Sequence, residues 1–202
     1  SQLLAEGIHP DRIDNLGKAI GLPVGPLASY DEVSQTLGLE IMDTQIEMGL
    51  RDPTKDPTPE GTELLKALVH EDHRGGRHHG GGFYEYTEAG KHIWPTLIER
   101  YHHSDRQISD QDIKDRLLFR PVIESLKCLE EGVLRSVADG NIGSLLGIGA
   151  PTWTGGYIQF VNTYGVDRFV ARCTALAEQC GERFQAPAIA HKRAKTGARF
   201  TS

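Results

Sequence analysis

Apolar residues recur with a helical period along most of the chain, and strand-like alternation is essentially absent. Residues 11–20 form an amphipathic pattern with Pro10 suited to its first turn and Gly21 to its end. A second helix is predicted to open at Ser29 or Tyr30. Its apolar residues share one stripe, which predicts a core-facing helix: Val33, Leu37, Ile41, Met42 and Ile46.

The middle of the chain alternates between turn signals and short helical patterns. The proline-rich stretch 52–59 must be extended or turned, and Thr58 is placed to cap a short helix ending near Val69. Residues 71–82 are charged and rich in glycine and histidine, which indicates a loop. The aromatic run 83–86 is expected to pack back onto this part of the chain, with a further helix over 93–101.

The longest predicted helix begins at residues 108–112 and runs to about Asp139. Pro121 should kink it or start its continuous part. The residues expected to face inward are Ile113, Leu117, Leu118, Val122, Ile123, Leu126, Leu129, Val133 and Leu134.

One pattern occurs twice. An acidic helix end, a glycine and a branched residue lead into a Gly/Pro turn and then into an aromatic helix that closes on glycine. Matching positions lie 125 residues apart for Gly7 and Gly132, 128 for Pro23 and Pro151, and 127 for Gly38 and Gly165. Such spacing predicts a duplicated module, with a first copy over 1–101, a linker over 102–109 and a second copy over 110–202 that ends in a basic tail.

Three motifs together resemble a known family. They are Gly-Leu-Pro-Val-Gly-Pro-Leu at 21–27, Gly-Gly-Gly-Phe-Tyr-Glu-Tyr at 80–86 and Gly-Ile-Gly-Ala-Pro-Thr-Trp-Thr-Gly-Gly at 147–156. In this order they are similar to the paired C-terminal helical modules of 3-hydroxyacyl-CoA dehydrogenases, above all the bacterial multifunctional fatty-acid oxidation proteins. The resemblance runs from Leu3 to about Pro187. It implies an all-α fold of two tandem modules, like the C-terminal region of 6-phosphogluconate dehydrogenase.

The family's hydride chemistry belongs to a dinucleotide-binding domain that this sequence does not contain. No apolar strand leads into a Gly-x-Gly-x-x-Gly turn and a helix. The resemblance places the family's catalytic His and Glu on that domain and its substrate-contacting Asn upstream of Ser1. We therefore expect a fragment with no catalytic residue and no bound cofactor or metal, from a parent that uses NAD to oxidise L-3-hydroxyacyl-CoA.

The expected partners follow from the same resemblance. They are the NAD-binding domain of the same polypeptide, the acyl-CoA substrate and a second copy in a homo-oligomer. An alternative from another class is a stand-alone interaction or dimerisation module without catalysis. The two hypotheses differ in one expectation: the enzyme requires a strand, a glycine-rich turn and an asparagine ahead of Ser1. Whether the parent also carries hydratase chemistry stays open.

Five residues are candidates for a substrate cleft or a domain interface. Gly147, Gly149 and Trp153 could line a groove for an acyl chain, because glycine lets a ligand approach the backbone and an aromatic ring covers an apolar chain. The favoured interpretation is structural: the glycines allow a close helix crossing, and the tryptophan fills the junction. Tyr30 and Asp31 could lie near a domain interface. Related multifunctional proteins can place a substrate-contacting tyrosine where this chain has Leu146.

Composition narrows the remaining classes. The chain is 38% hydrophobic and 25% charged with a net charge of −6, which disfavours a nucleic-acid binder and suits an ordinary folded protein. The basic run over 191–199 is interpreted as a solvated tail. No apolar run is long enough to span a membrane, and three cysteines without metal spacing fit a reducing, cytoplasmic compartment.

Four histidines gather near the predicted loop. A structural zinc could use them, but glycines separate the two pairs and no cysteine or carboxylate spacing completes the set, so an exposed basic loop is favoured. These residues are His70, His73, His78 and His79.

Overall fold

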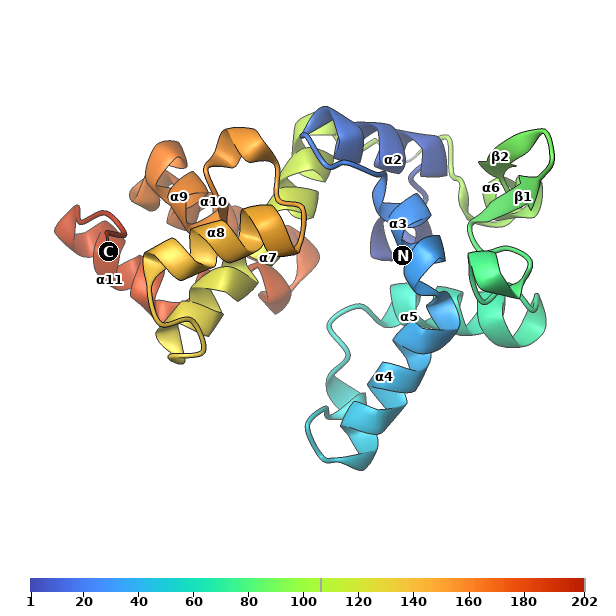
Figure 1. Ribbon diagram of the computed structural model, residues 1–202, viewed down its shortest axis with the longest axis horizontal. Coiled ribbons are helices and arrows are strands. Elements are labelled where there is room, and N and C mark those ends of the chain that lie inside the picture. Colours follow the sequence, from blue (N-terminus) through green and yellow to red (C-terminus); the bar gives the residue numbers. More distant parts are fainter. Residues whose placement is uncertain (106, 202) are drawn as a thin grey trace. The chain divides into compact units, whose positions relative to one another are not determined.

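Helices make up most of the chain, as the apolar period predicts (Figure 1). This computed structural model describes residues 1–105 and 107–201. One small sheet, a β-hairpin, is formed within this described part. The α-helices are α1 (Gln2–Ala5), α2 (Pro10–Ala19), α3 (Pro26–Val33), α4 (Gln35–Glu47), α5 (Pro59–Lys66), α6 (Pro95–Tyr101), α7 (Asp110–Glu130), α8 (Val137–Gly147), α9 (Tyr157–Tyr164), α10 (Val166–Cys180) and α11 (Ala188–Thr196). The single-turn elements are η1 (Pro53–Lys55), η2 (Ala67–Glu71), η3 (Arg77–His79), η4 (Thr152–Thr154) and η5 (Glu182–Phe184).

The chain divides into two compact units. Unit 1 contains Ser1–Lys18 and Val24–Ile113, and unit 2 contains Ala19–Pro23 and Lys114–Ser202. The division falls inside α7. The predicted linker 102–109 includes residue 106, which lies outside the described residues; at its start, the His103 N–H donates to the Gly7 carbonyl within unit 1 at 3.1 Å.

Unit 1 contains the hairpin that the sequence did not predict. Strands β1 (Tyr84–Thr87) and β2 (Gly90–Ile93) pair antiparallel, with Tyr84 opposite Ile93 and Thr87 opposite Gly90. The aromatic run is too short to show a period of two, so the strand signal was lost. Phe83, just before β1, is fully buried, as the expected packing of this run requires.

The core of unit 2 forms around α7. Phe119 is fully buried, stacks on Phe169 at 4.8 Å between ring centroids and meets Tyr164 edge-on at 5.4 Å. The helix continues through Pro121 but ends at Glu130, so the predicted end at Asp139 is wrong. A turn around Gly132, whose φ is +75°, separates α7 from α8 and leaves Val133 69% exposed instead of inward.

The duplication is visible in backbone geometry. Helix α3 is capped by Gly25 and followed by Ser34 with φ +92°, and α9 is capped by Gly156 and followed by Gly165 with φ +97°. Ser34 therefore matches Gly165, 131 residues away, whereas the predicted match Gly38 lies inside α4. The sequence did not reveal this register, because the residue of positive φ is a serine in the first copy. Only the second copy has the glycine that such a φ favours.

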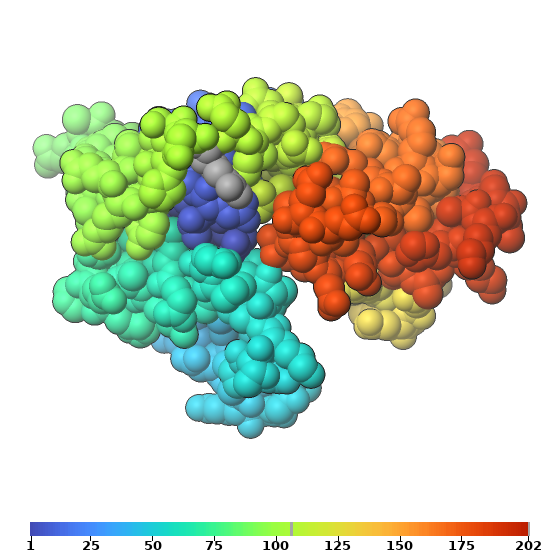
Figure 2. All heavy atoms as spheres, turned by 180° about the vertical axis from the view of Figure 1, so that it is seen from behind, coloured from blue at the N-terminus to red at the C-terminus, as the bar shows by residue number. Residues whose placement is uncertain are grey.

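Unit 1 differs from the prediction on the face of α4. The predicted core-facing residues Val33, Leu37 and Ile41 are exposed by 56%, 42% and 48%. Met42 and Ile46 are half-buried, and Leu39 is the buried apolar residue of this helix. The positive φ of Ser34 breaks the expected single helix into α3 and α4 and turns the stripe to solvent. The end of α4 and the following loop project from the body of unit 1 (Figures 1 and 2).

Candidate functional site

Asp31, a predicted interface residue, is fully buried inside unit 1. Its carboxylate accepts hydrogen bonds from the Phe83 N–H at 2.8 Å, the Tyr84 N–H at 2.9 Å and the Tyr86 hydroxyl at 3.1 Å. The Gln35 amide donates to it at 2.5 Å. Through these hydrogen bonds the Asp31 carboxylate joins α3 to the start of the hairpin. Asp31 is therefore a structural anchor.

Glycine explains how Asp31 reaches the hairpin backbone. A Cβ placed on Gly82 would lie 2.2 Å from Asp31 Oδ1, so a side chain there would displace the carboxylate. The glycine-rich stretch over 80–82 therefore has a local role, which is to let a buried acceptor approach two successive backbone N–H groups. This agrees with the interpretation of that stretch as a turn.

Asp14 is a second buried carboxylate that the sequence did not single out. It lies on α2 and accepts from the Leu27 N–H at 2.7 Å and the Ala28 N–H at 3.2 Å, in the first turn of α3. The Tyr84 hydroxyl donates to Asp14 Oδ2, the oxygen that also accepts from Ala28, at 2.6 Å, and burial together with this hydrogen bond raises the pKa of Tyr84. Tyr84 thus connects both carboxylates, through its N–H to Asp31 and through its hydroxyl to Asp14.

Unit 2 has a similar arrangement, with asparagine amides in place of the two carboxylates. Asn141 on α8 accepts from the Gln159 N–H at 2.8 Å and caps α9, as Asp14 caps α3. Asn162, which stands 131 residues after Asp31, accepts from the Phe200 N–H and donates to the Phe200 carbonyl, both at 2.8 Å. Matching polar positions in the two repeats are the signal that could have found these anchors.

Tyr30 lies at the edge of this network. Its ring lies 6.1 Å from the ring of Phe83, and burial raises the pKa of its hydroxyl. A Cβ on Gly38 would come 2.3 Å from the Tyr30 hydroxyl oxygen, so the ring lies over the glycine of α4. Tyr30 therefore belongs to the surface formed by α3 and α4.

The other three candidates lie together in unit 2, after α8. Gly147 ends the helix in open space, and Gly149 follows with φ +67° next to Pro23. Trp153 is 58% exposed and donates its indole N–H to the Ile20 carbonyl at 2.6 Å. Its ring also meets Phe160 edge-on at 5.8 Å, so the tryptophan both fills a junction and presents an open face.

Exposed apolar side chains also occur in this segment of the chain. Ile142 is 57% exposed, Leu146 84% and Ile148 67%, on the last turns of α8 and the residue after it. With Trp153 they form what we call the α8 surface: Ile142, Leu146, Ile148 and Trp153. Apolar residues gathered in this way typically mark a binding surface, and none of them can exchange a proton.

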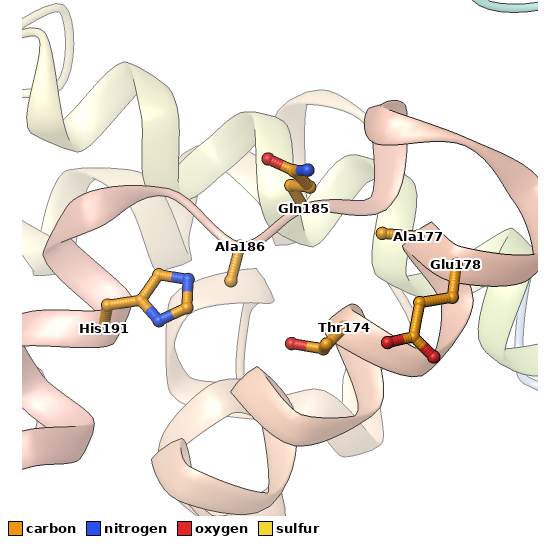
Figure 3. A pocket seen from close by; sticks show the side chains of 6 residues that line it. All are labelled: Thr174, Ala177, Glu178, Gln185, Ala186 and His191. Carbon is orange, nitrogen blue, oxygen red and sulfur yellow. The ribbon is translucent and has the colours of Figure 1, made fainter.

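A hollow of about 420 Å³ lies between α10 and α11 in unit 2. Figure 3 shows Thr174 and His191 directed toward each other across it, with Ala186 between them. The Thr174 hydroxyl already donates to the Val170 carbonyl at 3.1 Å. What remains is the carboxylate of Glu178 and the imidazole of His191 on an open surface, which is fewer ligands than a structural metal site uses.

The remaining reactive side chains do not form a cluster. The four histidines of the 70–79 region are all exposed, and no group of three or more His, Cys, Asp or Glu in the described ranges is arranged to hold a metal. Cys173 is buried in the unit 2 core, and burial raises the pKa of its thiol to about 12. A buried thiol of this kind packs as a small apolar group. No helix of the described residues is long and apolar enough to cross a membrane.

Known proteins match the first part of this chain as a family and nearly all of it as individual relatives. Residues 1–86 match the family described as 3-hydroxyacyl-CoA dehydrogenase, C-terminal domain. The chain is 32% identical over 192 residues to the fatty acid oxidation complex subunit alpha of Vibrio vulnificus, covering 94% of this chain and 26% of that protein. The same subunit of Shewanella frigidimarina is 33% identical over 204 residues, covering 99% of this chain and 28% of the relative. The chain thus spans about a quarter of the length of these curated relatives.

Proposed function

Because residues 1–86 match the 3-hydroxyacyl-CoA dehydrogenase C-terminal domain family, we propose that the chain serves as the helical wall of an L-3-hydroxyacyl-CoA dehydrogenase cleft. The parent would oxidise the 3-hydroxyacyl-CoA to the 3-ketoacyl-CoA in fatty-acid oxidation, in the cytoplasm. The observation that supports this role is the α8 surface, which is apolar, exposed and free of titratable groups. Such a surface suits an acyl chain, whose binding requires burial and positioning.

The Gly147-Ile148-Gly149 turn does not fit NAD, the cofactor that the family implies. A pyrophosphate favours a helix N-terminus, where free N–H groups point at the ligand. The Gly147-Ile148-Gly149 turn instead follows the C-terminal end of α8, where carbonyl groups are exposed. We therefore assign the nicotinamide cofactor to another domain of the same parent polypeptide and derive no step of the reaction through it.

The contribution of this chain is to bind and to exclude water. Hydride transfer needs a substrate held in line, and well-oriented binding can supply about 7 kcal/mol or more of a barrier without proton transfer. The side chains on the α8 surface would contact the acyl chain, and Trp153 is fixed for this by its bond to the Ile20 carbonyl. Leu146, where relatives can carry a tyrosine, makes this contact apolar in the present chain.

Replacing Leu146 with aspartate in the parent enzyme tests this role. Full burial of a leucine is worth about 1.5–3 kcal/mol, so the charged variant should raise KM for a long-chain 3-hydroxyacyl-CoA about tenfold or more, with kcat little changed. The matched control is Val133→Asp, which places the same charge on an exposed apolar residue in the turn between α7 and α8. Equal KM values for both variants would contradict a substrate-binding role for the α8 surface.

The alternative, a stand-alone interaction module, is favoured by the same exposure of apolar groups. The two hypotheses differ in what binds to the α8 surface: a second copy of the chain or the acyl chain of the substrate. If the chain self-associates through the α8 surface, Leu146→Asp should convert a dimer to a monomer in size-exclusion chromatography with light scattering. A monomer before and after the substitution leaves the substrate role as the better account.

A further inference from the structure

The two units carry opposite charge. Unit 1 contains 20 aspartate and glutamate residues and 10 lysine and arginine residues, whereas unit 2 contains 8 and 12. The formal net charge of −6 is therefore −10 in unit 1 and +4 in unit 2. A surface of one sign attracts ligands of the opposite sign and repels those of its own. Unit 2 is the part of the chain that suits an anionic ligand.

The basic residues at the end of unit 2 lie on folded backbone. The sequence indicates a solvated tail over 191–199, but residues up to Thr196 belong to α11. After the helix, Phe200 is 2% exposed, and Asn162 binds both its N–H and its carbonyl at 2.8 Å. Arg193 lies over the Phe200 ring at 5.3 Å and donates to the Arg199 carbonyl at 2.6 Å. The backbone that carries these charges is therefore fixed before a ligand binds.

The cations of this segment have no carboxylate partner. The following four residues form no ion pair among the residues that the structure describes: Lys192, Arg193, Lys195 and Arg199. Elsewhere in unit 2, Arg120, Lys127 and Arg172 each pair with a carboxylate. Lys192 and Lys195 are exposed, and their spacing of three places them on one side of α11. That side of the helix suits phosphate groups.

The hollow between α10 and α11 lies beside these lysines. His191 lines it and stands four residues before Lys195, on the same side of the helix. Its volume of about 420 Å³ falls within the range of small-molecule pockets, about 300–1,000 Å³. Ala177 and Ala186 give it apolar walls, and the Gln185 amide, which offers a donor and an acceptor, makes no hydrogen bond within the described part of the chain. A flat aromatic base with polar edges fits this lining.

The hollow also contains one carboxylate. Glu178 lines it from α10 and lies on the side of Thr174 away from His191 (Figure 3). A phosphate next to Glu178 would be repelled by the like charge. The phosphates of a bound nucleotide therefore belong at the end near His191 and the two lysines.

We propose that unit 2 binds the 3′-phosphorylated ADP part of CoA, with the adenine in the hollow and the phosphates at Lys192 and Lys195. A single nucleotide suits this site better than a nucleic acid, because the basic stretch is short and unit 1 is acidic. The choice of CoA among phosphorylated nucleotides rests on the proposed function, whose substrate is an acyl-CoA. The site itself rests on the lining of the hollow and the charges of α11.

Isothermal titration calorimetry with the 202-residue chain tests the site. In a buffer of about 50 mM salt with a reductant, CoA should bind, 3′-dephospho-CoA should bind about threefold more weakly, and pantetheine should not bind, because the phosphates supply the attraction. NADH has the ADP part without the 3′-phosphate and should bind as weakly as 3′-dephospho-CoA. Raising the salt to about 0.5 M should weaken CoA binding about tenfold.

Substitutions locate the site. Lys192→Glu combined with Lys195→Glu should weaken CoA binding about tenfold or more, because two attractive charges become repulsive. The matched control, Lys18→Glu combined with Lys91→Glu, changes the net charge equally at exposed lysines of unit 1 and should leave the affinity within about twofold. Gln185→Ala should weaken CoA binding about threefold, through loss of a hydrogen bond to the base.

Four results would overturn the proposal: no binding of CoA, equal affinity for pantetheine, equal weakening by the two double substitutions, or tighter binding of a short DNA duplex than of CoA. The calorimetry involves no turnover, so a negative result leaves the proposed activity of the parent standing. Equal KM values in the Leu146→Asp test would likewise leave this binding site standing.

Discussion

Asp31→Ala is expected to lower the free energy of unfolding of unit 1 by about 4 kcal/mol. The substitution leaves the N–H groups of Phe83 and Tyr84 and the hydroxyl of Tyr86 without their buried acceptor. Each buried donor left unpaired costs about 1–3 kcal/mol, and a whole domain is stable by only about 5–15 kcal/mol. The hairpin should therefore detach and unit 1 should unfold at much lower denaturant.

Urea unfolding can follow unit 1 alone, because each unit holds one tryptophan. In a Trp153→Phe background the fluorescence of Trp94 reports on unit 1. Asp43→Ala, at an exposed aspartate of α4, is the matched control and should change stability by about 0.5 kcal/mol or less. The stability of Asp31→Asn should lie between that of the unsubstituted chain and that of Asp31→Ala. Asparagine at the matching position of unit 2 accepts from one N–H and donates to one carbonyl. An unchanged midpoint for Asp31→Ala would show that the anchor does not stabilise unit 1.

Gly156→Ala is expected to destabilise unit 2 by about 3 kcal/mol. The residue has φ +105°, and an added Cβ would lie 2.5 Å from Asn141 Cα and 2.6 Å from its Cβ. Left-handed strain on a residue other than glycine costs about 1–3 kcal/mol, and overpacking costs about the same again. Relief of the clash would move α9 away from α8 and break the cap that Asn141 gives to Gln159.

The control for this variant is another glycine of the same unit. Gly143 lies inside α8 with open space where a Cβ would be, so Gly143→Ala should stabilise the helix by about 0.5–1 kcal/mol. In a Trp94→Phe background, Trp153 fluorescence reports on unit 2 in both variants. The two variants should change the free energy of unfolding of unit 2 in opposite directions. Equal changes would mean that the contact between Gly156 and Asn141 does not limit the packing of α8 and α9.

The helical period and the glycine turns were sufficient to predict the all-α architecture, because both are local properties of the sequence. Gly7 and Gly132 have positive φ as expected, and α2 begins at Pro10. The register of the repeat at α4 could not be read, since Ser34 adopts φ +92° against the preference of its residue type. Two hydrogen bonds hold it there, from its hydroxyl to the Gly75 carbonyl and from the Leu37 N–H to its hydroxyl oxygen.

The candidate residues show a second limit of sequence reasoning. Asp31 and Trp153 carry groups that suit either a ligand or a junction, and only the partners of those groups separate the two roles. The two backbone donors to Asp31 come from residues 52 and 53 positions further along the chain, a separation that no local pattern encodes. The exposure of Val33 and Ile41 was likewise hidden, because an apolar stripe does not record whether another element packs on it.

The most direct test of the proposed role is hydride transfer by the 202-residue chain itself. The chain is mixed with NAD and 3-hydroxybutyryl-CoA, or a longer analogue, and NADH formation is followed by absorbance, with the full-length parent as the positive control. A fluorescence titration with NADH measures cofactor binding by the same sample. We predict turnover by the parent, and neither turnover nor tight NADH binding by this chain. Turnover or tight NADH binding by the isolated chain would contradict the account.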